Sequence, residues 1–221
     1  MERCPFGLVA FDLDGTLVAH GEPIWKTLHQ ACGSDLARRK AVLRAALSGQ
    51  ISYADWFAED IEMLQAAGAS LEDIQGVLSA LTPMDGATGL VRDLQMVGVK
   101  VVVISGGIQR VIDTVLPELT FDAVLINRLF FDDAGSLLGG EPTPFDRAHK
   151  VEGLRMLAER FGVPLAETAF IGDGPNDVMV AQVAGFSIAW GAADATLIEV
   201  ADVHVNATDL DALRPLLFPP G

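Results

Sequence analysis

The stretch VAFDLDGTLV, residues 9–18, begins with apolar residues and then places two aspartates, Asp12 and Asp14, one residue apart. The apolar part predicts a buried strand, and the aspartates follow where that strand would end. Two carboxylates this close repel each other unless a cation lies between them, and Mg²⁺ prefers oxygen ligands. Two aspartates with this spacing, taken alone, more often lie in a solvated turn. Whether they form a metal site must therefore be judged from the rest of the chain.

Five further apolar runs alternate with helical patterns, which predicts a doubly wound, Rossmann-like α/β fold whose parallel sheet is covered on both faces. These runs are residues 99–105, 121–126, 167–173, 186–190 and 201–205. Ser105 and Asp173 end two of them, as Asp12 and Asp14 end the first. Ligands bind beyond the carboxyl ends of such strands, so we expect these groups to meet in one crevice. Residues 127–140 predict a hairpin that turns at residues 133–135.

Residues 19–82 have helical spacing and little strand character. We interpret them as a helical cap domain inserted after the first strand, with residues 1–18 and 83–221 forming the core domain. Serines are predicted to begin three of the cap helices and glycines to end three. The expected N-caps are Ser34, Ser52 and Ser70, and the expected stops are Gly33, Gly49 and Gly68.

The composition restricts the partners. Thirty acidic residues against fifteen basic ones give the 221-residue chain a net charge of −15, which disfavours nucleic acid and anionic membranes. No apolar run approaches the roughly 20 residues that cross a bilayer, and the first residues do not resemble a signal peptide. Cys4 and Cys32 have no metal-ligand spacing and are expected to be free thiols. We therefore expect a cytoplasmic protein; its oligomeric state cannot be predicted.

Four motifs occur in a fixed order: DLDGTL at residues 12–17, ISGG at 104–107, a lysine at 150 and GDGPND at 172–177. Together they resemble the motifs of the haloacid dehalogenase superfamily. Within it, the helical insert, LTPMDGA at 81–87 and INRL at 126–129 resemble the phosphoserine phosphatase branch. The resemblance covers nearly the whole chain and implies a hydrolase of phosphoric monoesters.

The resemblance also implies roles for individual residues. Asp12 matches the nucleophile that forms an aspartyl-phosphate, and Asp14 matches the general acid and base. Mg²⁺ would be held by Asp12, the backbone carbonyl of Asp14 and Asp173, with Asp177 in support. Lys150 would join the phosphate to the nucleophile and offset the acids. The neighbouring Arg147 and Arg155 are also basic, so the choice of Lys150 depends on the family pattern.

The remaining motif residues are expected to bind substrate. Ser105 and the Gly106 N–H would bind phosphoryl oxygens, and Asn176 would orient the site. Each has a plainer alternative: Ser105 could cap a helix at 107–116, and Asn176 could cap the helix after GDGPND. Glu22 matches, with a one-residue slip, the glutamate that binds the ammonium group of phosphoserine in the family.

The arginine that binds the substrate carboxylate in the family is missing. No lysine or arginine occurs between Arg44 and Arg92, where the cap would supply it. Candidate replacements are Lys26, Arg38, Arg39, Lys40, Arg44 and Arg110. We therefore expect a magnesium-dependent, phosphoserine phosphatase-like enzyme that acts on a small soluble phosphate ester; the alternative is a phosphatase for a non-amino-acid substrate such as a sugar phosphate.

Other functions remain open on the same scaffold. A phosphotransferase or phosphomutase would use the same motifs and return the phosphoryl group to an organic acceptor. A dehalogenase needs no proton donor for its leaving halide, so Asp14 argues against that chemistry. A non-catalytic binding module is a third hypothesis, because fold does not fix function. The complete set of acids and the lysine argue against it.

Overall fold

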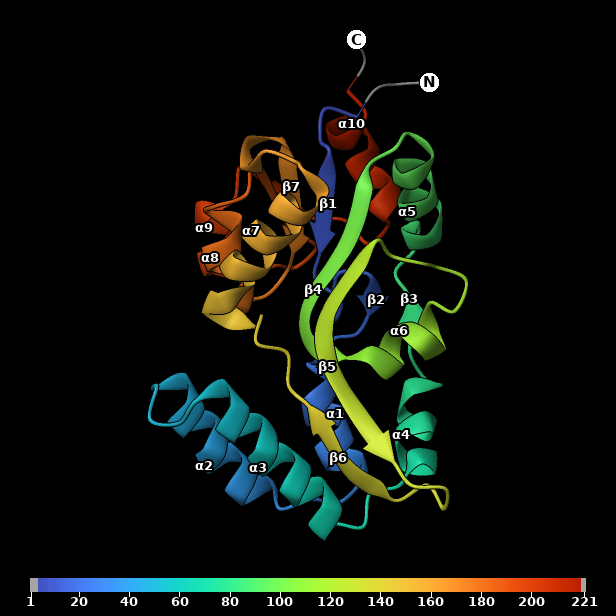
Figure 1. Cartoon of the computed structure of the whole chain (residues 1–221), viewed down its shortest axis with the longest axis vertical. Helices are drawn as coiled ribbons and strands as arrows, with labels where there is room; N and C mark the ends of the chain where they lie inside the picture. Colours follow the sequence, from blue (N-terminus) through green and yellow to red (C-terminus); the bar gives the residue numbers. More distant parts are fainter. Residues whose placement is uncertain (1–3, 220–221) are drawn as a thin grey trace.

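The computed structural model describes residues 4–219 of the chain (Figure 1). Its main sheet has seven strands in the order β6-β5-β4-β1-β7-β8-β9. The strands are β1 Leu8–Phe11, β4 Lys100–Ile108, β5 Ala123–Phe131, β6 Leu137–Glu141, β7 Thr168–Gly172, β8 Phe186–Trp190 and β9 Val203–Val205. Neighbouring strands are parallel except β6, which pairs antiparallel with β5. The predicted doubly wound α/β fold is confirmed.

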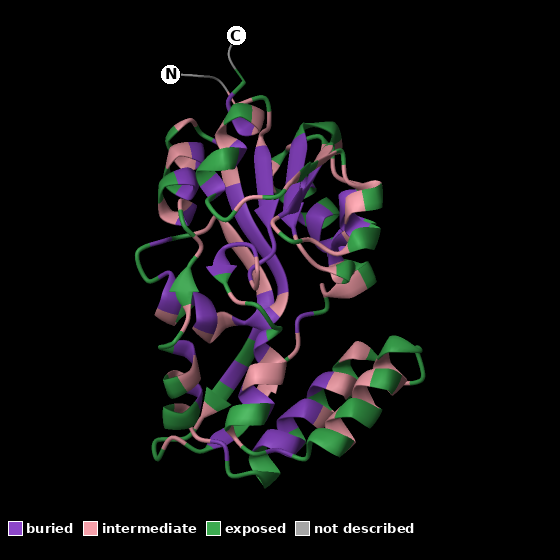
Figure 2. Ribbon diagram, turned by 180° about the vertical axis from the view of Figure 1, so that it is seen from behind, coloured by how far each residue is buried: buried purple, intermediate pink, exposed green. Residues whose placement is uncertain are grey.

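Helices cover both faces of the sheet (Figure 1). The core helices are α5 Ala87–Met96, α6 Gln109–Val115, α7 Lys150–Phe161, α8 Val178–Ala181, α9 Ala195–Val200 and α10 Arg214–Leu217. Side chains of β1 alternate between the two layers, as expected for a strand buried on both faces. Val9 and Phe11 pack in the cluster that contains Leu90 of α5, whereas Leu8 packs with Leu154 of α7. Figure 2 shows the resulting buried centre of the sheet.

The cap consists of four helices that follow β1 and a short strand, β2 Val18–Ala19. They are α1 Ile24–Ala31, α2 Leu36–Leu47, α3 Tyr53–Ala66 and α4 Leu71–Leu78. A second short strand, β3 Thr82–Pro83, pairs with β2 where the chain returns to the core. The β5–β6 hairpin extends beyond the core to reach α3, where Gln65 donates to the carbonyl of Leu137 (3.1 Å). The division into a core of residues 1–18 and 83–221 and a cap of 19–82 stays a prediction.

Most local predictions for the cap helices are confirmed. Ser52 begins α3 and Ser70 begins α4, each in a capping box with the acid three residues later. Ser34 was the wrong choice for α2, because Asp35 provides the cap by accepting from two backbone N–H groups. Glycines follow the ends of α1, α2 and α3 with positive φ, as predicted: Gly33, Gly49 and Gly68.

The region after β4 differs from the prediction. A helix was expected over residues 107–116, but the strand continues through the two glycines to Ile108 and α6 begins at Gln109. The irregular pairing of β4 with β5 between Ile104 and Ile108 accompanies this extension. The predicted hairpin at 127–140 is confirmed, with its turn between Phe131 and Leu137. None of the described helices is both long and apolar enough to span a membrane.

Candidate active site

The nucleophile candidate lies at the end of the central strand. Asp12 follows β1, and its N–H donates to the carbonyl of Ile171 in β7 (2.9 Å), so the two strand ends are held together. Gly15 turns the chain with a φ of 81°, and a side chain there would collide with the Asp173 carboxylate. The hydroxyl of Thr16 donates to Asp173 Oδ1 (3.3 Å). The first and fourth motifs therefore meet in one crevice.

Three carboxylates form a compact cluster in this crevice. Asp12, Asp173 and Asp177 each offer an oxygen, and these oxygens lie within 4.8 Å of one another. Burial, followed by the charges of Asp12 and Asp177, raises the pKa of Asp173 to about 8. Burial also raises the pKa of Asp177 to about 6, although Lys150 opposes the shift. So many buried like charges are stable as ions only with additional positive charge among them.

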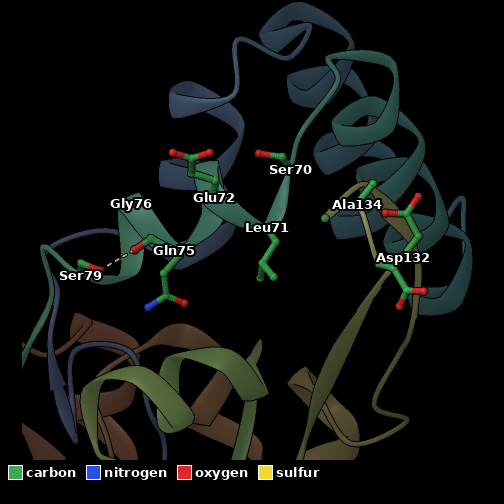
Figure 3. Close-up of a pocket in the computed structure, with 10 residues that line it drawn as sticks. Ser70, Leu71, Glu72, Gln75, Gly76, Ser79, Asp132 and Ala134 are labelled. Atoms are coloured by element: carbon green, nitrogen blue, oxygen red, sulfur yellow. Dashed lines mark hydrogen bonds between the residues drawn. The ribbon is translucent and has the colours of Figure 1, made fainter.

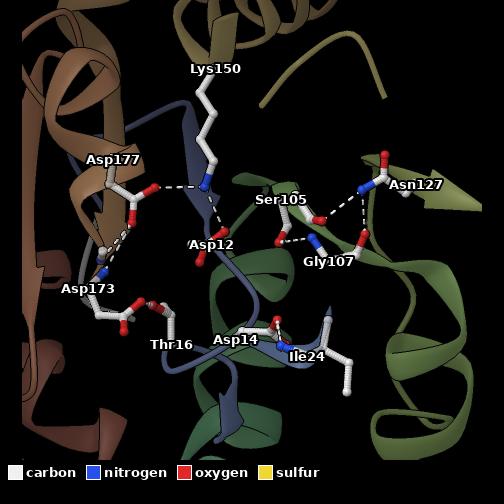
Figure 4. A network of polar contacts seen from close by, with 12 residues as sticks. Asp12, Asp14, Thr16, Ile24, Ser105, Gly107, Asn127, Lys150, Asp173 and Asp177 are labelled. Atoms are coloured by element: carbon white, nitrogen blue, oxygen red, sulfur yellow. Dashed lines mark hydrogen bonds and ion pairs between the residues drawn. The ribbon is translucent and has the colours of Figure 1, made fainter. Parts of the chain in front are cut away.

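Lys150, the first residue of α7, supplies part of that charge (Figure 4). Its side chain is fully buried, and its Nζ lies 2.7 Å from Asp12 Oδ1 and 2.6 Å from Asp177 Oδ1. Burial opposes its charge, but Asp12, Asp177 and Asp146 outweigh burial and raise its pKa. The lysine predicted from the family pattern thus contacts the predicted nucleophile.

Asp14 points away from the cluster and toward the cap. Its Oδ2 accepts from the N–H of Ile24, the first residue of α1 (3.1 Å). Burial, followed by the charge of Asp12, raises the pKa of Asp14 to about 7. A carboxyl with a pKa in this range can donate and take back a proton near neutral pH, as a general acid and base must.

The ISGG segment forms a phosphate-binding candidate beside these acids. The buried Ser105 accepts through Oγ from the Gly107 N–H (3.1 Å). The amide of Asn127, fully buried on β5, donates to the carbonyls of Gly106 (2.7 Å) and Gly107 (2.9 Å). The two glycine carbonyls are therefore fixed from the side of β5. Because α6 begins only at Gln109, the glycines belong to the end of the strand rather than to a helix.

The cap reaches this loop and Asp14 through two side chains and one backbone group that the sequence did not single out as site features. Trp25 of α1 donates through Nε1 to the Gly106 carbonyl (2.8 Å), and Tyr53 of α3 bonds through its hydroxyl to the amide of Asn127. With the Ile24 N–H on Asp14, they link the cap to Asp14 and to residues 104–107, the candidate phosphate-binding segment, which we call the phosphate loop. The INRL motif contains Asn127, but nothing in the sequence indicates which groups the Asn127 side chain contacts.

Two predicted substrate residues lie outside these contacts. The carboxylate of Glu22 is about half exposed and pairs with Lys26 (2.6 Å), an arrangement typical of a surface ion pair. The side chain of Asn176 folds back against Gly174 at the start of the turn that carries Asp177. Their roles in substrate binding stay predictions.

The candidate replacements for the missing arginine have other environments. Lys40 and Arg44 are exposed. The others contact acids or an aromatic ring: Lys26 with Glu22 (2.6 Å), Arg38 with Glu59 (2.7 Å), Arg39 with Asp60 (3.7 Å) and Arg110 with the Phe131 ring (4.7 Å to its centroid).

A hollow at the far end of the cap lies between the start of α4 and the β5–β6 turn (Figure 3). It contains none of the predicted site residues. Its polar lining includes Ser70, Glu72, Gln75, Asp132 and Asp133.

The acidic cluster suits a hard divalent cation. Its donors are carboxylate oxygens from two adjoining strand ends, the type that Mg²⁺ binds. Burial and the neighbouring acids raise the pKa values of Asp173 and Asp177 although Lys150 lies beside them, and a divalent cation would favour their ionised forms. Asp12, Asp173 and Asp177 would hold the ion. The carboxylate of Asp14 is not part of the cluster, which leaves only its backbone carbonyl as the predicted ligand.

Comparisons with known proteins show the family to which the chain belongs. Residues 6–185 match the family model of haloacid dehalogenase-like hydrolases. The chain is 36% identical over 211 residues to Phosphoserine phosphatase SerB2 of Mycobacterium tuberculosis, covering 95% of this chain and 50% of that protein. It is 31% identical over 214 residues to the phosphoserine phosphatase of Idiomarina loihiensis, covering 92% and 90%.

A solved structure described as a phospho-aspartyl intermediate analogue of phosphoserine phosphatase has the same fold. Its TM-score is 0.75 at 26% identity, covering 98% of this chain and 100% of that chain. The present chain spans only half the length of the Mycobacterium tuberculosis relative.

Proposed function

The chain belongs to the phosphoserine phosphatase-like branch of the haloacid dehalogenase-like hydrolases, and from this premise we propose that it is a magnesium-dependent phosphomonoesterase. One observation carries the proposal: the fully buried Lys150 bridges Asp12 and Asp177, while Asp173 lies close enough to share a cation with both. This arrangement leaves Asp12, at the end of the central strand, beside the loop that would hold a phosphoryl group.

In the proposed first step a carboxylate oxygen of Asp12 attacks phosphorus. A P–O bond to Asp12 forms as the ester P–O bond breaks, giving an aspartyl-phosphate and an alcohol. Asp14 transfers its proton to the leaving oxygen. Ser105 and the Gly106 N–H bind phosphoryl oxygens, and Lys150 offsets negative charge on the phosphoryl group and on Asp12.

In the second step water replaces Asp12 on phosphorus. Asp14, now ionised, takes a proton from the water while the water oxygen attacks phosphorus. The P–O bond to Asp12 then breaks and inorganic phosphate is released. Bound Mg²⁺ would supply charge neutralisation of the phosphoryl oxygens. The raised pKa of Asp14 suits both roles, because the group must be protonated in one step and ionised in the next.

The substrate is proposed to be a small soluble phosphate ester. The cap contacts both Asp14 and the phosphate loop, so a closed cap would exclude water and enclose the leaving group. A protein substrate would not fit beneath such a closed cap. The expected cytoplasmic location agrees with a phosphorylated metabolite as substrate.

A phosphate-release assay tests the proposal. The protein is incubated with phosphoserine, sugar phosphates and simple alkyl phosphates, with Mg²⁺ or with EDTA. Release that requires Mg²⁺ and vanishes in Asp12→Asn supports the proposal, and Asp133→Asn, an exposed aspartate on the β5–β6 turn, is the matched control. Phosphoryl transfer to an added alcohol that outcompetes transfer to water would favour the alternative, a phosphotransferase or phosphomutase. Binding without turnover would contradict both.

A further inference from the structure

An additional carboxylate, which the mechanism does not use, lies against the phosphate loop. Asp146 precedes the short 3₁₀ turn Arg147–His149 that leads into α7. A Cβ placed on Gly106 would lie 2.5 Å from Asp146 Oδ2 and 2.6 Å from its Cγ. The Asp146 carboxylate therefore occupies the space that any side chain at position 106 would need.

This carboxylate is incompletely satisfied. Its Oδ1 is buried and accepts no hydrogen bond from the residues that the structure describes. Burial raises the pKa of Asp146, and Lys150 together with the backbone N–H and the charge of Arg147 acts against that rise. Arg147, directly after it, has a φ of 52°, a left-handed conformation that costs energy in a residue with a Cβ. A buried acceptor without a donor, next to a strained residue, is unfavourable for folding alone and points to a donor from a ligand.

The position of Asp146 is suited to contact with a leaving group. Its carboxylate lies against Gly106, and the carbonyl of Gly106 accepts a hydrogen bond from Trp25 of the cap. Tyr53 is the cap residue that is hydrogen-bonded to Asn127. Burial is the main cause of its raised pKa, and the charge of Asp146 is the second cause. Asp146 therefore lies between the phosphate loop and the cap, where an ester held at Ser105 and Gly106 would extend its alcohol part.

On the core side the cations Lys150 and Arg147 act on Asp146, whereas a long part of the cap has no basic residue. Residues 45–82 of the cap contain no lysine or arginine, and the basic side chains Lys26, Arg38 and Arg39 lie beside acids. A leaving group with a carboxylate would add an anion near Asp146, whereas an ammonium group would satisfy its free oxygen.

We propose that Asp146 determines leaving-group specificity by binding a protonated amine, so that the substrate is the phosphate ester of an amino alcohol. This inference rests on the proposed phosphatase function. It differs from the expectation for Glu22, which pairs with Lys26 at the surface.

Three esters test the inference: phosphoethanolamine, n-propyl phosphate, in which a methyl group replaces the ammonium, and phosphoserine, which adds a carboxylate. We expect kcat/KM for phosphoethanolamine to exceed that for n-propyl phosphate by about 10- to 100-fold, the range of a charge-assisted hydrogen bond. Asp146→Asn, which keeps the shape and removes the charge, should bring this ratio close to one. Phosphoserine should be no better than phosphoethanolamine, because its carboxylate gains no base from residues 45–82 of the cap.

The ratio separates recognition from structural damage, because a variant that merely loosens the loop would lose activity on both esters alike. Asp133→Asn is the control and should leave the ratio unchanged. Equal rates on the amine and methyl esters, or an undiminished ratio in Asp146→Asn, would overturn the inference while the phosphatase function stands. A large preference for phosphoserine over phosphoethanolamine would overturn the amino-alcohol assignment.

Two fallbacks cover failed variants. If Asp146→Asn does not fold by circular dichroism, Asp146→Ser is measured with the same expected ratio. If the wild type hydrolyses no ester, the proposed function fails. Calorimetric binding of phosphoethanolamine and n-propyl phosphate to Asp12→Asn then decides whether the amine is recognised: tighter binding of the amine supports the inference, and equal binding overturns it.

Discussion

Replacing Asp173 with asparagine should stabilise the metal-free protein at alkaline pH while abolishing magnesium-dependent turnover. Burial, followed by the charges of Asp12 and Asp177, raises the pKa of Asp173 from 3.8 to about 8. The unfolded chain therefore binds fewer protons than the native state between about pH 4 and pH 8, so stability falls as the pH rises through this range.

The size of the effect follows from the shift. About four pKa units, at about 1.4 kcal/mol each, correspond to on the order of 5 kcal/mol at pH 9. Asparagine cannot ionise, so the variant avoids this cost, and its amide oxygen can still accept from the Thr16 hydroxyl. At about 2–4 °C per kcal/mol for a chain of this size, the melting temperature of the variant should exceed that of the wild type by on the order of 10 °C. At pH 5 the difference should be much smaller.

Thermal unfolding followed by circular dichroism, in EDTA at pH 5, 7 and 9, measures the effect. Mg²⁺ should raise the melting temperature of the wild type at pH 9 and that of Asp173→Asn much less, because a ligand that binds only the native state stabilises it by mass action. Asp133→Asn, on the exposed turn, should behave as the wild type throughout. An advantage of Asp173→Asn that is absent, or equal at pH 5 and pH 9, would refute the electrostatic reasoning.

Two further substitutions test the other charged groups of the site. Lys150→Met should lower the free energy of unfolding by about 3–5 kcal/mol, measured in urea, because Asp12 and Asp177 lose their buried counter-charge; a stable variant would show that the acids are neutral without the lysine. Asp14→Asn should slow the single-turnover release of the alcohol from an alkyl ester by about 10²- to 10⁴-fold, but far less that of nitrophenol from nitrophenyl phosphate, whose leaving oxygen needs no proton; this release precedes the step in which Asp14 acts as a base. Equal losses on the two esters would exclude Asp14 as the proton donor.

The sheet and the site were predictable from sequence because both follow from where apolar runs end. A parallel strand that is buried on both faces is apolar along its length, and polar groups such as Asp12 and Asp173 mark its exit into the crevice. The two capping boxes at Ser52 and Ser70 were predictable because caps depend on neighbours three residues away. The Lys150 assignment needed the family pattern, since a basic residue has no periodicity of its own.

The features that sequence did not reveal depend on distant contacts. Tyr53 and Asn127 are 74 positions apart, and Trp25 and Gly106 are 81 apart, so no local pattern links them. In the sequence, Asp146 resembles any acid that precedes a helical turn. Only the fold shows that its carboxylate lies against Gly106. The extension of β4 through Gly106 and Gly107 was missed because paired glycines usually end a strand, whereas here the amide of Asn127 binds their carbonyls.

The ion pair between Lys150 and Asp12 joins residues 138 positions apart, and the bond from Thr16 to Asp173 spans 157. Chains emerge from the ribosome with the N-terminus first, so the cap helices, with their local contacts, can form while Asp12 still lacks its counter-charge. The central strand gains its second parallel neighbour, β7, only when synthesis has passed Gly172. Catalytic competence is therefore among the last properties that the nascent polypeptide would acquire, and a prematurely terminated product would carry Asp12, the proposed nucleophile, without its partners Lys150 and Asp173.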